Sequence, residues 1–435
     1  MARFPTYGSP LRRARLLRLA RMRFRRRALF VGGGVAVGAC AVALAAAADR
    51  VAGLFNALFA QAPLSVLLLT PAGFALSSFL SRRFFPNSGG SGIPQSIAAR
   101  ALHSRRARER LVGLRMAAGK SALLLLGLLC GASIGREGPT VQVGASVMFA
   151  AGRLTLRRQP GLILAGAGAG VAAAFNTPLA GIVFGIEEMS RAFETRTTAV
   201  VLGTVIAAGL TSLFLLGDYT YFGVTQVSLG GVAGWAVLPV LAAAGGLLGG
   251  LFSRVLVVAA SPSALGRLVR ARPVLFAAGC GLLVAVAGLL SGGEVFGTGY
   301  AQARALVQNE PGAPSLLFGV LKFVASLLSA VAGIPGGIFA PSLAVGAGLG
   351  AYAAALVPSA PAGALAVVGM VSYFSGVVQA PLTAFVIVSE MTGDHALIVP
   401  LMLASLIGSG ASRLLCHEGV YHALSRNYLA GAAQH

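Results

Sequence analysis

Two glutamates stand in parts of the sequence that otherwise carry almost no charge. Glu137 lies just before Gly138 and Pro139 at the start of an apolar run, and Glu188 closely follows the apolar run 177–186. A carboxyl group among membrane-embedded apolar residues is costly, so each is by default a functional candidate. The alternatives are an acid favoured by a helix start for Glu137 and an ordinary charge at a cytoplasmic helix end for Glu188.

Three stretches rich in Gly and Pro precede apolar runs, and each predicts a helix N-terminus. Pro suits the first helical turn, and Gly leaves the backbone N–H groups uncovered at the positive end of the helix dipole. Inside a bilayer those donors need a partner, and a dehydrated halide or similar anion supplies one. Any one stretch alone could be a packed helix break, but three together favour an anion site. They are Gly90-Ser91-Gly92-Ile93-Pro94, Gly135-Arg136-Glu137-Gly138-Pro139 and Gly337-Ile338-Phe339-Ala340-Pro341.

The composition places these segments in a membrane. The chain has 435 residues, 34 Lys+Arg against 12 Asp+Glu and a net charge of +22, yet 56% of residues are hydrophobic and only 11% are charged. A nucleic-acid binder would spread its basic residues over a solvated surface, whereas here long stretches carry no charge. Disorder and an ordinary soluble domain are excluded as well. We therefore expect an all-α polytopic membrane protein without nucleic acid among its partners.

Apolar runs predict the spans. The first, 28–48, follows a basic N-terminal segment and matches the length of a bilayer span better than the core of a signal peptide, so we expect residues 1–27 to form a cytoplasmic amphipathic helix. Several later runs are too short to cross alone and are broken by Gly and Pro, which is typical of re-entrant and discontinuous helices. The later runs are 63–80, 116–134, 140–151, 161–175, 177–186, 198–216, 232–258, 274–291, 315–332, 338–357, 362–378, 380–389 and 395–412.

Arginine clusters predict the orientation. Basic loops face the cytoplasm, and the segments 49–62 and 217–231 are nearly free of basic residues. We therefore expect the N-terminus and the C-terminus to be cytoplasmic. The basic clusters are 82–83, 100–115, 153–158, 191–196 and 254–272.

An internal repeat divides the chain into two related halves. Pro139-Thr-Val-Gln-Val-Gly-Ala matches Pro341-Ser-Leu-Ala-Val-Gly-Ala at an offset of 202 residues, Pro178 matches Pro381 at 203, and Glu188 matches Glu390 at 202. The predicted organisation is a first membrane repeat over 28–216, an extracytoplasmic connection over 217–231, a second repeat over 232–413, and a C-terminal helix and tail over 414–435. The repeat alone leaves open whether the halves are inverted or parallel.

The sequence resembles the CLC family of chloride channels and chloride/proton exchangers over nearly the whole chain. The resemblance lies in the order and spacing of the three Gly/Pro segments, Ala172–Met189 and Tyr421. The resemblance implies two inverted halves packed around one anion pathway in each subunit of a homodimer. It implies a secondary transporter of chloride coupled to proton antiport, in a bacterial inner membrane, with chloride, protons and the lipid bilayer as partners and without cofactor or metal. A passive chloride-selective channel is the alternative. Because the chain ends shortly after Tyr421, we expect a prokaryotic-type member without cytoplasmic regulatory domains.

The resemblance also assigns the anion ligands. It implies that the Ser91 hydroxyl, the backbone N–H groups of Ile338 and Phe339, and the Tyr421 phenol coordinate the central anion. From the residues alone, Ser91 could instead be a plain N-cap and Tyr421 an interfacial belt residue.

The proton-handling residues are assigned in the same way. Glu137 is implied as the external gate and proton acceptor, because its carboxylate can compete with an anion for the same N–H groups. Glu188 is implied as the internal proton-transfer residue, where channel members usually have an apolar side chain. The resemblance also implies that Glu187 helps water to reach the pathway. Lys120 matches a family lysine, with snorkelling to an interface as the alternative. The supporting residues are Gly90, Gly92, Pro94, Gly135, Arg136, Gly138, Pro139, Gly337, Pro341, Lys120 and Glu187.

Two positions depart from the family pattern. Gln95 and Ile97 stand where many relatives have acids.

The alternative class of an intramembrane enzyme is not favoured. It would need a nucleophile motif such as Gly-x-Ser-x-Gly or a metal motif such as His-Glu-x-x-His, and we expect neither. The five histidines are expected in loops or the tail, and the four cysteines in the core. These are His103, His395, His417, His422 and His435, and Cys40, Cys130, Cys280 and Cys416.

Overall fold

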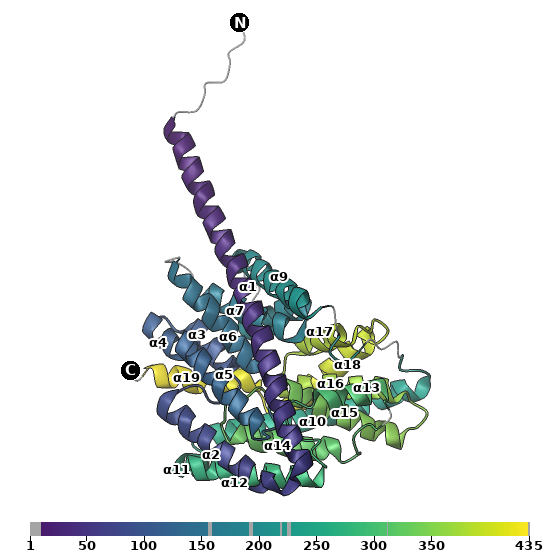
Figure 1. Ribbon diagram of the computed structural model, residues 1–435. Coiled ribbons are helices and arrows are strands. Elements are labelled where there is room, and N and C mark those ends of the chain that lie inside the picture. Colours follow the sequence, from purple (N-terminus) through teal and green to yellow (C-terminus); the bar gives the residue numbers. More distant parts are fainter. Residues whose placement is uncertain are drawn as a thin grey trace.

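The computed structural model describes residues 10–154, 159–190, 195–217, 220–223, 228–310 and 312–433 (Figure 1). Helices make up nearly all of the regular structure in these ranges, and extended backbone pairs there only at two isolated bridges. The prediction of an all-α protein is confirmed.

The first helix is long and unbroken. Helix α1 runs from Pro10 to Gln61, and its N-terminal end extends away from the other helices in Figure 1. The basic segment and the first apolar run therefore share one helix. The predicted amphipathic character of residues 1–27 concerns side chains outside the described part of the chain and stays a prediction.

Length and apolar composition mark the membrane-spanning helices. Within the described ranges, six helical stretches are long and apolar enough to cross a bilayer, whereas others of similar composition are only 10–17 residues long. Two of the short ones, Ala362–Val378 and Pro381–Thr392, begin directly at a proline, which is typical of discontinuous and re-entrant helices. The six long stretches are Ala28–Gln61, Pro63–Phe84, Arg105–Leu129, Val232–Ala260, Pro273–Leu290 and Phe339–Leu356.

Each later apolar run largely coincides with a helix, and the helices 93–101, 105–112, 264–271 and 300–308 lie outside the predicted runs. In the first half the helices after α1 are η1 (Pro63–Ser65), α2 (Val66–Phe84), α3 (Ile93–Ala101), α4 (Arg105–Val112), α5 (Leu114–Leu129), α6 (Glu137–Ala151), η2 (Gly152–Leu154), α7 (Gln159–Phe175), α8 (Pro178–Phe184), η3 (Gly185–Ser190) and α9 (Thr195–Leu216). In the second half they are α10 (Val232–Ala260), α11 (Ala264–Ala271), α12 (Pro273–Leu290), α13 (Tyr300–Gln308), α14 (Phe318–Val331), α15 (Phe339–Leu356), α16 (Ala362–Val378), α17 (Pro381–Thr392) and α18 (Ile398–Arg413), followed by α19 (Val420–Ala433).

The internal repeat is visible in the helices and in their packing. Helices α6, α7, α8 and α9 begin 202 or 203 residues before α15, α16, α17 and α18. Helix α6 packs on α7 as α15 packs on α16, and α7 packs on α9 as α16 packs on α18. The starts of α6 and α15 meet at an antiparallel bridge between Gly135 and Gly337, so these two N-termini face each other across the halves. The last helix, α19, returns to lie beside α3 of the first half (Figure 1).

A π-helical turn distinguishes the end of α8 from its counterpart in the second half. Segment η3 (Gly185–Ser190) directly continues α8, whereas its counterpart α17 stays α-helical to Thr392. A π-turn accommodates one more residue than the α-helical turn it replaces. Beyond this turn, α9 again begins 203 residues before α18, so the offset of 202 between Glu188 and Glu390 is local.

Basic segments far apart in sequence meet one another. Arg115 donates to the carbonyl oxygen of Phe84 at 3.4 Å, Arg153 forms an ion pair with Glu109, and Arg100 donates to the carbonyl oxygen of Met189 at 2.8 Å. The arginine-poor segment 49–62 instead contacts the loop after α12, where the Phe59 and Phe296 rings lie 5.4 Å apart. Charged and uncharged loops thus separate as the sequence indicates, and the cytoplasmic orientation stays a prediction.

The expectation for the cysteines is wrong at one position. Cys130, Cys280 and Cys416 are buried, but Cys40 is exposed. It lies on a face of α1 that the other described helices leave uncovered.

Candidate functional site

The three Gly/Pro segments are joined by backbone hydrogen bonds. Gly135 and Gly337 each donate an N–H to the other's carbonyl oxygen at 2.7 Å. Gly90 accepts the N–H of Gly336 at 3.2 Å and donates its own to the carbonyl oxygen of Ile334 at 3.3 Å. The starts of α3, α6 and α15 are therefore held in one place, as the sequence predicts for a shared site.

Glycine is required at two of these positions. The φ angle of Gly92 is +101°, a conformation that residues with a side chain rarely adopt. A Cβ atom added at Gly138 would lie 2.7 Å from the carbonyl oxygen of Ser91 and 3.3 Å from Cα of Gly337. The backbone of α6 thus approaches both neighbouring segments more closely than any side chain would allow. Pro94, Pro139 and Pro341 all occupy first turns, as predicted.

The four predicted anion ligands lie on elements that meet at these helix starts. Ser91 is buried and its Oγ accepts the N–H of Ile93 at 3.3 Å, which leaves its own O–H free to donate. Ile338 and Phe339 form the first positions of α15. The Tyr421 ring stacks on Phe339, with centroids 5.9 Å apart and planes at 16°.

Tyr421 is not an interfacial belt residue, because it is only 1% exposed. Its hydroxyl has no hydrogen-bond partner among the described residues. A buried hydroxyl without a partner is costly, and an anion would satisfy it. The predicted ligands are therefore neutral donors, and one of them is a buried hydroxyl without a partner among the described residues.

Glu137 points back into this site. Its side chain is completely buried, and a Cβ atom added at Gly135 would overlap its Oε2 and lie 3.3 Å from Cβ of Ala340. The carboxylate therefore lies between the starts of α6 and α15, beside the N–H groups that an anion would use. This is the place that a competitor for the anion must occupy.

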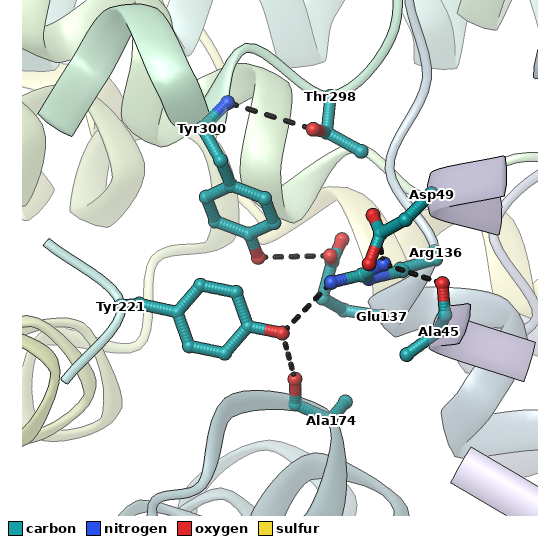
Figure 2. Close-up of polar contacts among 8 residues, drawn as sticks. All are labelled: Ala45, Asp49, Arg136, Glu137, Ala174, Tyr221, Thr298 and Tyr300. Atoms are coloured by element: carbon teal, nitrogen blue, oxygen red, sulfur yellow. Dashed lines mark hydrogen bonds and ion pairs between the residues drawn. The ribbon is translucent and has the colours of Figure 1, made fainter. Parts of the chain in front are cut away.

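Arg136, adjacent to Glu137, directs its guanidinium toward Ala45, Asp49 and Tyr221 (Figure 2). Its guanidinium donates to Asp49 at 2.6 Å, to the carbonyl oxygen of Ala45 at 2.8 Å and to the Tyr221 hydroxyl at 3.0 Å. Tyr221 in turn donates to the carbonyl oxygen of Ala174 at 2.8 Å. The arginine thus ties α1 and the segment 220–223 to the start of α6, and its charge is already paired.

Sequence reasoning missed Tyr300. This tyrosine begins α13, and its hydroxyl donates to Oε1 of Glu137 at 2.8 Å (Figure 2). The missed signal is Gly297-Thr298-Gly299, which precedes α13 as Gly90-Ser91-Gly92 precedes α3. The φ angles of Gly297 and Gly299 are +67° and +83°. Those of Gly90 and Gly92 are similar, at +67° and +101°.

The two lysines of the chain are related by the repeat. Lys120 and Lys322 are 202 residues apart, and both are completely buried. Lys120 donates to the carbonyl oxygen of Gly90 at 2.8 Å, and Lys322 donates to those of Val295 and Gly297, each at 2.8 Å. Each lysine therefore holds the loop that leads into a Gly-x-Gly helix start. Snorkelling of Lys120 to an interface is excluded by its burial.

Glu187 and Glu390 cap helices of the opposite halves. The Glu187 carboxylate accepts the N–H groups of Leu382 and Thr383 at the start of α17, at 3.1 and 2.6 Å. The Glu390 carboxylate accepts those of Leu179 and Ala180 at the start of α8, at 3.1 and 2.8 Å. Each acid satisfies donors at a helix N-terminus of the other half. A role for Glu187 in water access stays a prediction.

Glu188 is buried beside a histidine that sequence reasoning misplaced. His422 was expected in a loop or the tail, but it lies in the first turn of α19, next to Tyr421. Its Nε2 lies 2.8 Å from the carbonyl oxygen of Glu188 and 3.6 Å from Oε1 of that residue. The structure thus brings Glu188 against the helix that carries a predicted anion ligand.

Gln95, a departure from the family pattern, has a structural role. Its buried amide donates to the carbonyl oxygens of Asn87 and Gly89 at 3.1 and 2.6 Å and lies 2.9 Å from the Tyr428 hydroxyl. An ionised acid could not donate these bonds. Ile97 is also buried, in the apolar core.

One expectation about enzyme motifs is wrong. The segment Gly131-Ala132-Ser133-Ile134-Gly135 has the spacing of a Gly-x-Ser-x-Gly nucleophile motif. Ser133 is buried and bonded to Ser326 and Ser329 of α14, at 3.0 and 3.2 Å, and none of its described hydrogen bonds involves a histidine or carboxylate. The serine therefore ties α14 to the loop before α6. Within the described residues, no group of three His, Cys, Asp or Glu side chains could hold a metal ion.

Comparisons with known proteins agree with this geometry. The family model described as voltage gated chloride channel matches residues 73–413. A H(+)/Cl(-) exchange transporter named ClcA from Vibrio cholerae is 33% identical over 388 residues, which cover 83% of this chain and 80% of that protein. The ClcA of Citrobacter koseri is 31% identical over 425 residues, covering 91% and 87%. The solved structure of a slow cyanobacterial Cl-/H+ antiporter has a TM-score of 0.79 and 26% identity, and the match covers 92% of this chain and 97% of that one.

Proposed function

The chain belongs to the voltage gated chloride channel family, and on that premise we infer that it is a membrane transporter that exchanges chloride for protons. Relatives that share about a third of its residues over most of both chains are named exchangers. The passive channel is not favoured, because Glu188 stands at the position where channel members of the family usually have an apolar residue.

The observation that carries the mechanism is the position of the Glu137 carboxylate. It is completely buried and lies between the starts of α6 and α15, where it competes with an anion for the same donors. Protonation removes its charge and hence its attraction to the helix ends, so the side chain leaves and an anion enters. Proton binding and anion binding are therefore linked through one group.

We propose that the central anion is bound by the Ser91 hydroxyl, the N–H groups of Ile338 and Phe339, and the Tyr421 phenol. The support is the buried, unpartnered Tyr421 hydroxyl and the free O–H of Ser91 beside uncovered helix starts. Neutral donors bind chloride firmly enough to replace part of its hydration yet release it, as conduction requires.

We propose that protons travel between Glu188 on the inner side and Glu137 on the outer side. His422 follows Tyr421 in α19 and lies 3.6 Å from Oε1 of Glu188, and the Tyr421 ring stacks on Phe339 at the start of α15, beside which Glu137 lies. The two glutamates and Tyr421 therefore lie in one region of the protein interior. The Tyr421 phenol is an anion ligand, however, and the transfer requires intervening water.

The finer assignments rest on the family resemblance. We propose a homodimer with one anion pathway in each subunit, a bacterial inner-membrane location, and cytoplasmic termini. The meeting of the basic segments around Phe84, Glu109 and Met189 supports the orientation, since basic loops face the cytoplasm.

Proteoliposomes test the exchange directly. An outward chloride gradient should drive proton uptake against a proton gradient in the wild-type protein. A Glu137→Gln variant mimics the protonated acid, so chloride flux should persist, lose its pH dependence and no longer move protons. Chloride flux without proton uptake in the wild type would contradict the exchanger and support the passive channel. A Glu137→Gln variant that still pumps protons would show that Glu137 is not part of the mechanism.

A further inference from the structure

The Glu137 carboxylate is held by a phenol from the other half of the molecule. Tyr300 supplies the one side-chain hydrogen bond that the described part of the chain gives this carboxylate, at 2.8 Å to Oε1. The Glu137 Oε2 lies beside the start of α15, because a Cβ atom added at Gly135 would meet both this oxygen and Cβ of Ala340. The seated carboxylate of the first half is thus hydrogen-bonded by a residue of the second half.

The Tyr300 ring is fixed on two faces. It packs against the Tyr221 ring, with centroids 4.7 Å apart, and against the Phe222 ring at 5.8 Å. Tyr221 is itself bonded to Arg136 and to the carbonyl oxygen of Ala174, as Figure 2 shows. The aromatic pair therefore cannot turn without breaking bonds to α6 and to the end of α7.

The backbone before Tyr300 is fixed as well. Lys322 donates to the carbonyl oxygen of Gly297, and Gly299 packs so closely that an added Cβ atom would lie 2.6 Å from Cβ of Ala344 and 2.8 Å from Cε of Lys322. The hydroxyl thus comes from a rigid helix start, which suits a group that must hold a partner in one position.

The chemistry of this hydrogen bond depends on the state of Glu137. A phenol O–H donated to an ionised carboxylate is a charge-assisted hydrogen bond, about twice as strong as a neutral one. Protonation of Glu137 removes that advantage, while the phenol keeps its own proton. Tyr300 therefore favours the ionised, seated form over the protonated, released form.

We propose that Tyr300 is a positioning residue that latches the external gate in its closed state and so sets the proton concentration at which the gate opens. This inference rests on the proposed role of Glu137 and adds the residue that tunes it. Among the described residues, titratable or charged side chains with contacts near the gate include Arg136, Asp49, Tyr221, Tyr421, Lys120 and Lys322, and we expect each to keep its contacts when only the Tyr300 hydroxyl is removed.

The test is a Tyr300→Phe variant, which keeps the ring and its packing but removes the hydroxyl. Chloride flux in proteoliposomes should rise at neutral and alkaline pH, and its half-maximal point should move up by about one pH unit, equivalent to a tenfold change in the seating equilibrium. The ratio of chloride to protons should stay that of the wild type, because Glu137 and Glu188 are intact.

Tyr373→Phe is the matched control. Tyr373 is also completely buried, but its hydroxyl has no hydrogen-bond partner among the described residues, so its removal should leave the pH profile unchanged. A Tyr221→Phe variant should give a smaller shift in the same direction as Tyr300→Phe, since it loosens the ring that supports Tyr300 without breaking the bond to Glu137.

A double variant separates the latch from the gate. In a Glu137→Gln background, Tyr300→Phe should have no further effect on flux or its pH dependence. If Glu137→Gln behaves as a removed gate but Tyr300→Phe keeps the wild-type half-maximal pH, or lowers flux equally at every pH, the latch is wrong and the gate stands. If Glu137→Gln keeps the wild-type pH dependence, the proposed function itself fails.

Discussion

The two halves of the molecule keep some repeat-related residues alike. Lys120 and Lys322 are both buried and both hold loops that lead into helix starts. The carboxylates of Glu187 and Glu390 both accept N–H groups at helix starts of the opposite half. These matched residues bind backbone groups, and their contacts serve the same structural purpose in each half.

Other repeat-related positions differ, and the differences lie at the proposed site. Glu137 corresponds to Phe339 at the offset of 202, so one half contributes the competing carboxylate and the other an aromatic ring against Tyr421. Glu188 is the second acid of a pair where the other half has only Glu390. Residues that are alike in the two halves therefore make structural contacts, and positions that differ between the halves carry the proposed transport chemistry.

The largest expected effect is the difference in proton transport between a Glu188 variant and a Glu390 variant. Glu188→Gln should abolish proton movement while anion movement persists at least in part, because Ser91 and Tyr421 are untouched. Glu390→Gln should keep chloride-driven proton uptake in the same proteoliposome assay, since its carboxylate contacts only the start of α8 among the described residues. Loss of coupling in both variants would contradict the division between scaffold and transport residues.

Replacing either Lys120 or Lys322 should lower the stability moderately, and the loss should be larger for Lys322. Methionine keeps much of the apolar stem but leaves the bound carbonyl oxygens without a donor, at about 1–3 kcal/mol for each buried group. Lys322→Met leaves two described carbonyl groups without a hydrogen-bond donor, and Lys120→Met leaves one. Lys322→Met should therefore lower the unfolding free energy more. Denaturation in detergent measures this, and the reverse order would show that the carbonyl contacts are not what the lysines provide.

The smallest effect should come from the reciprocal helix caps, and it should be equal in both halves. Replacing Glu187 or Glu390 by Ala removes one cap each and should cost about 1 kcal/mol of unfolding free energy. The same denaturation measurement checks it, with the wild type as reference. A clearly larger loss for one of them would mean that this acid has a second task in transport.

Local chemistry made the helix starts predictable. Gly138 and Pro139 beside Glu137 indicate an exposed helix start and an acid next to it, because Gly and Pro act on their own backbone and need no distant partner. The same holds for Ser91 within Gly90-Ser91-Gly92. The structure confirms that these starts meet, and the roles of their residues stay proposals.

Distant contacts were not predictable in this way. Tyr300 and Glu137 are 163 residues apart, and nothing in the sequence around either residue specifies the other. His422 and Glu188 are 234 apart and meet only because α19 returns to the first half. Gly297-Thr298-Gly299 could have been found as a counterpart of Gly90-Ser91-Gly92, but it lies 207 residues on, outside the offset that the other matches define.

The π-turn at η3 has a consequence for how such a transporter couples its two substrates. In the first half this turn carries two adjacent acids, Glu187 and Glu188, where the second half has the single acid Glu390. Glu187 and Glu390 share a spacing of nine residues from the preceding proline, and both cap a helix of the opposite half. Glu188 is thus the additional acid, and under the proposed function the coupling of two ion gradients depends on one residue by which the two copies of this helix differ.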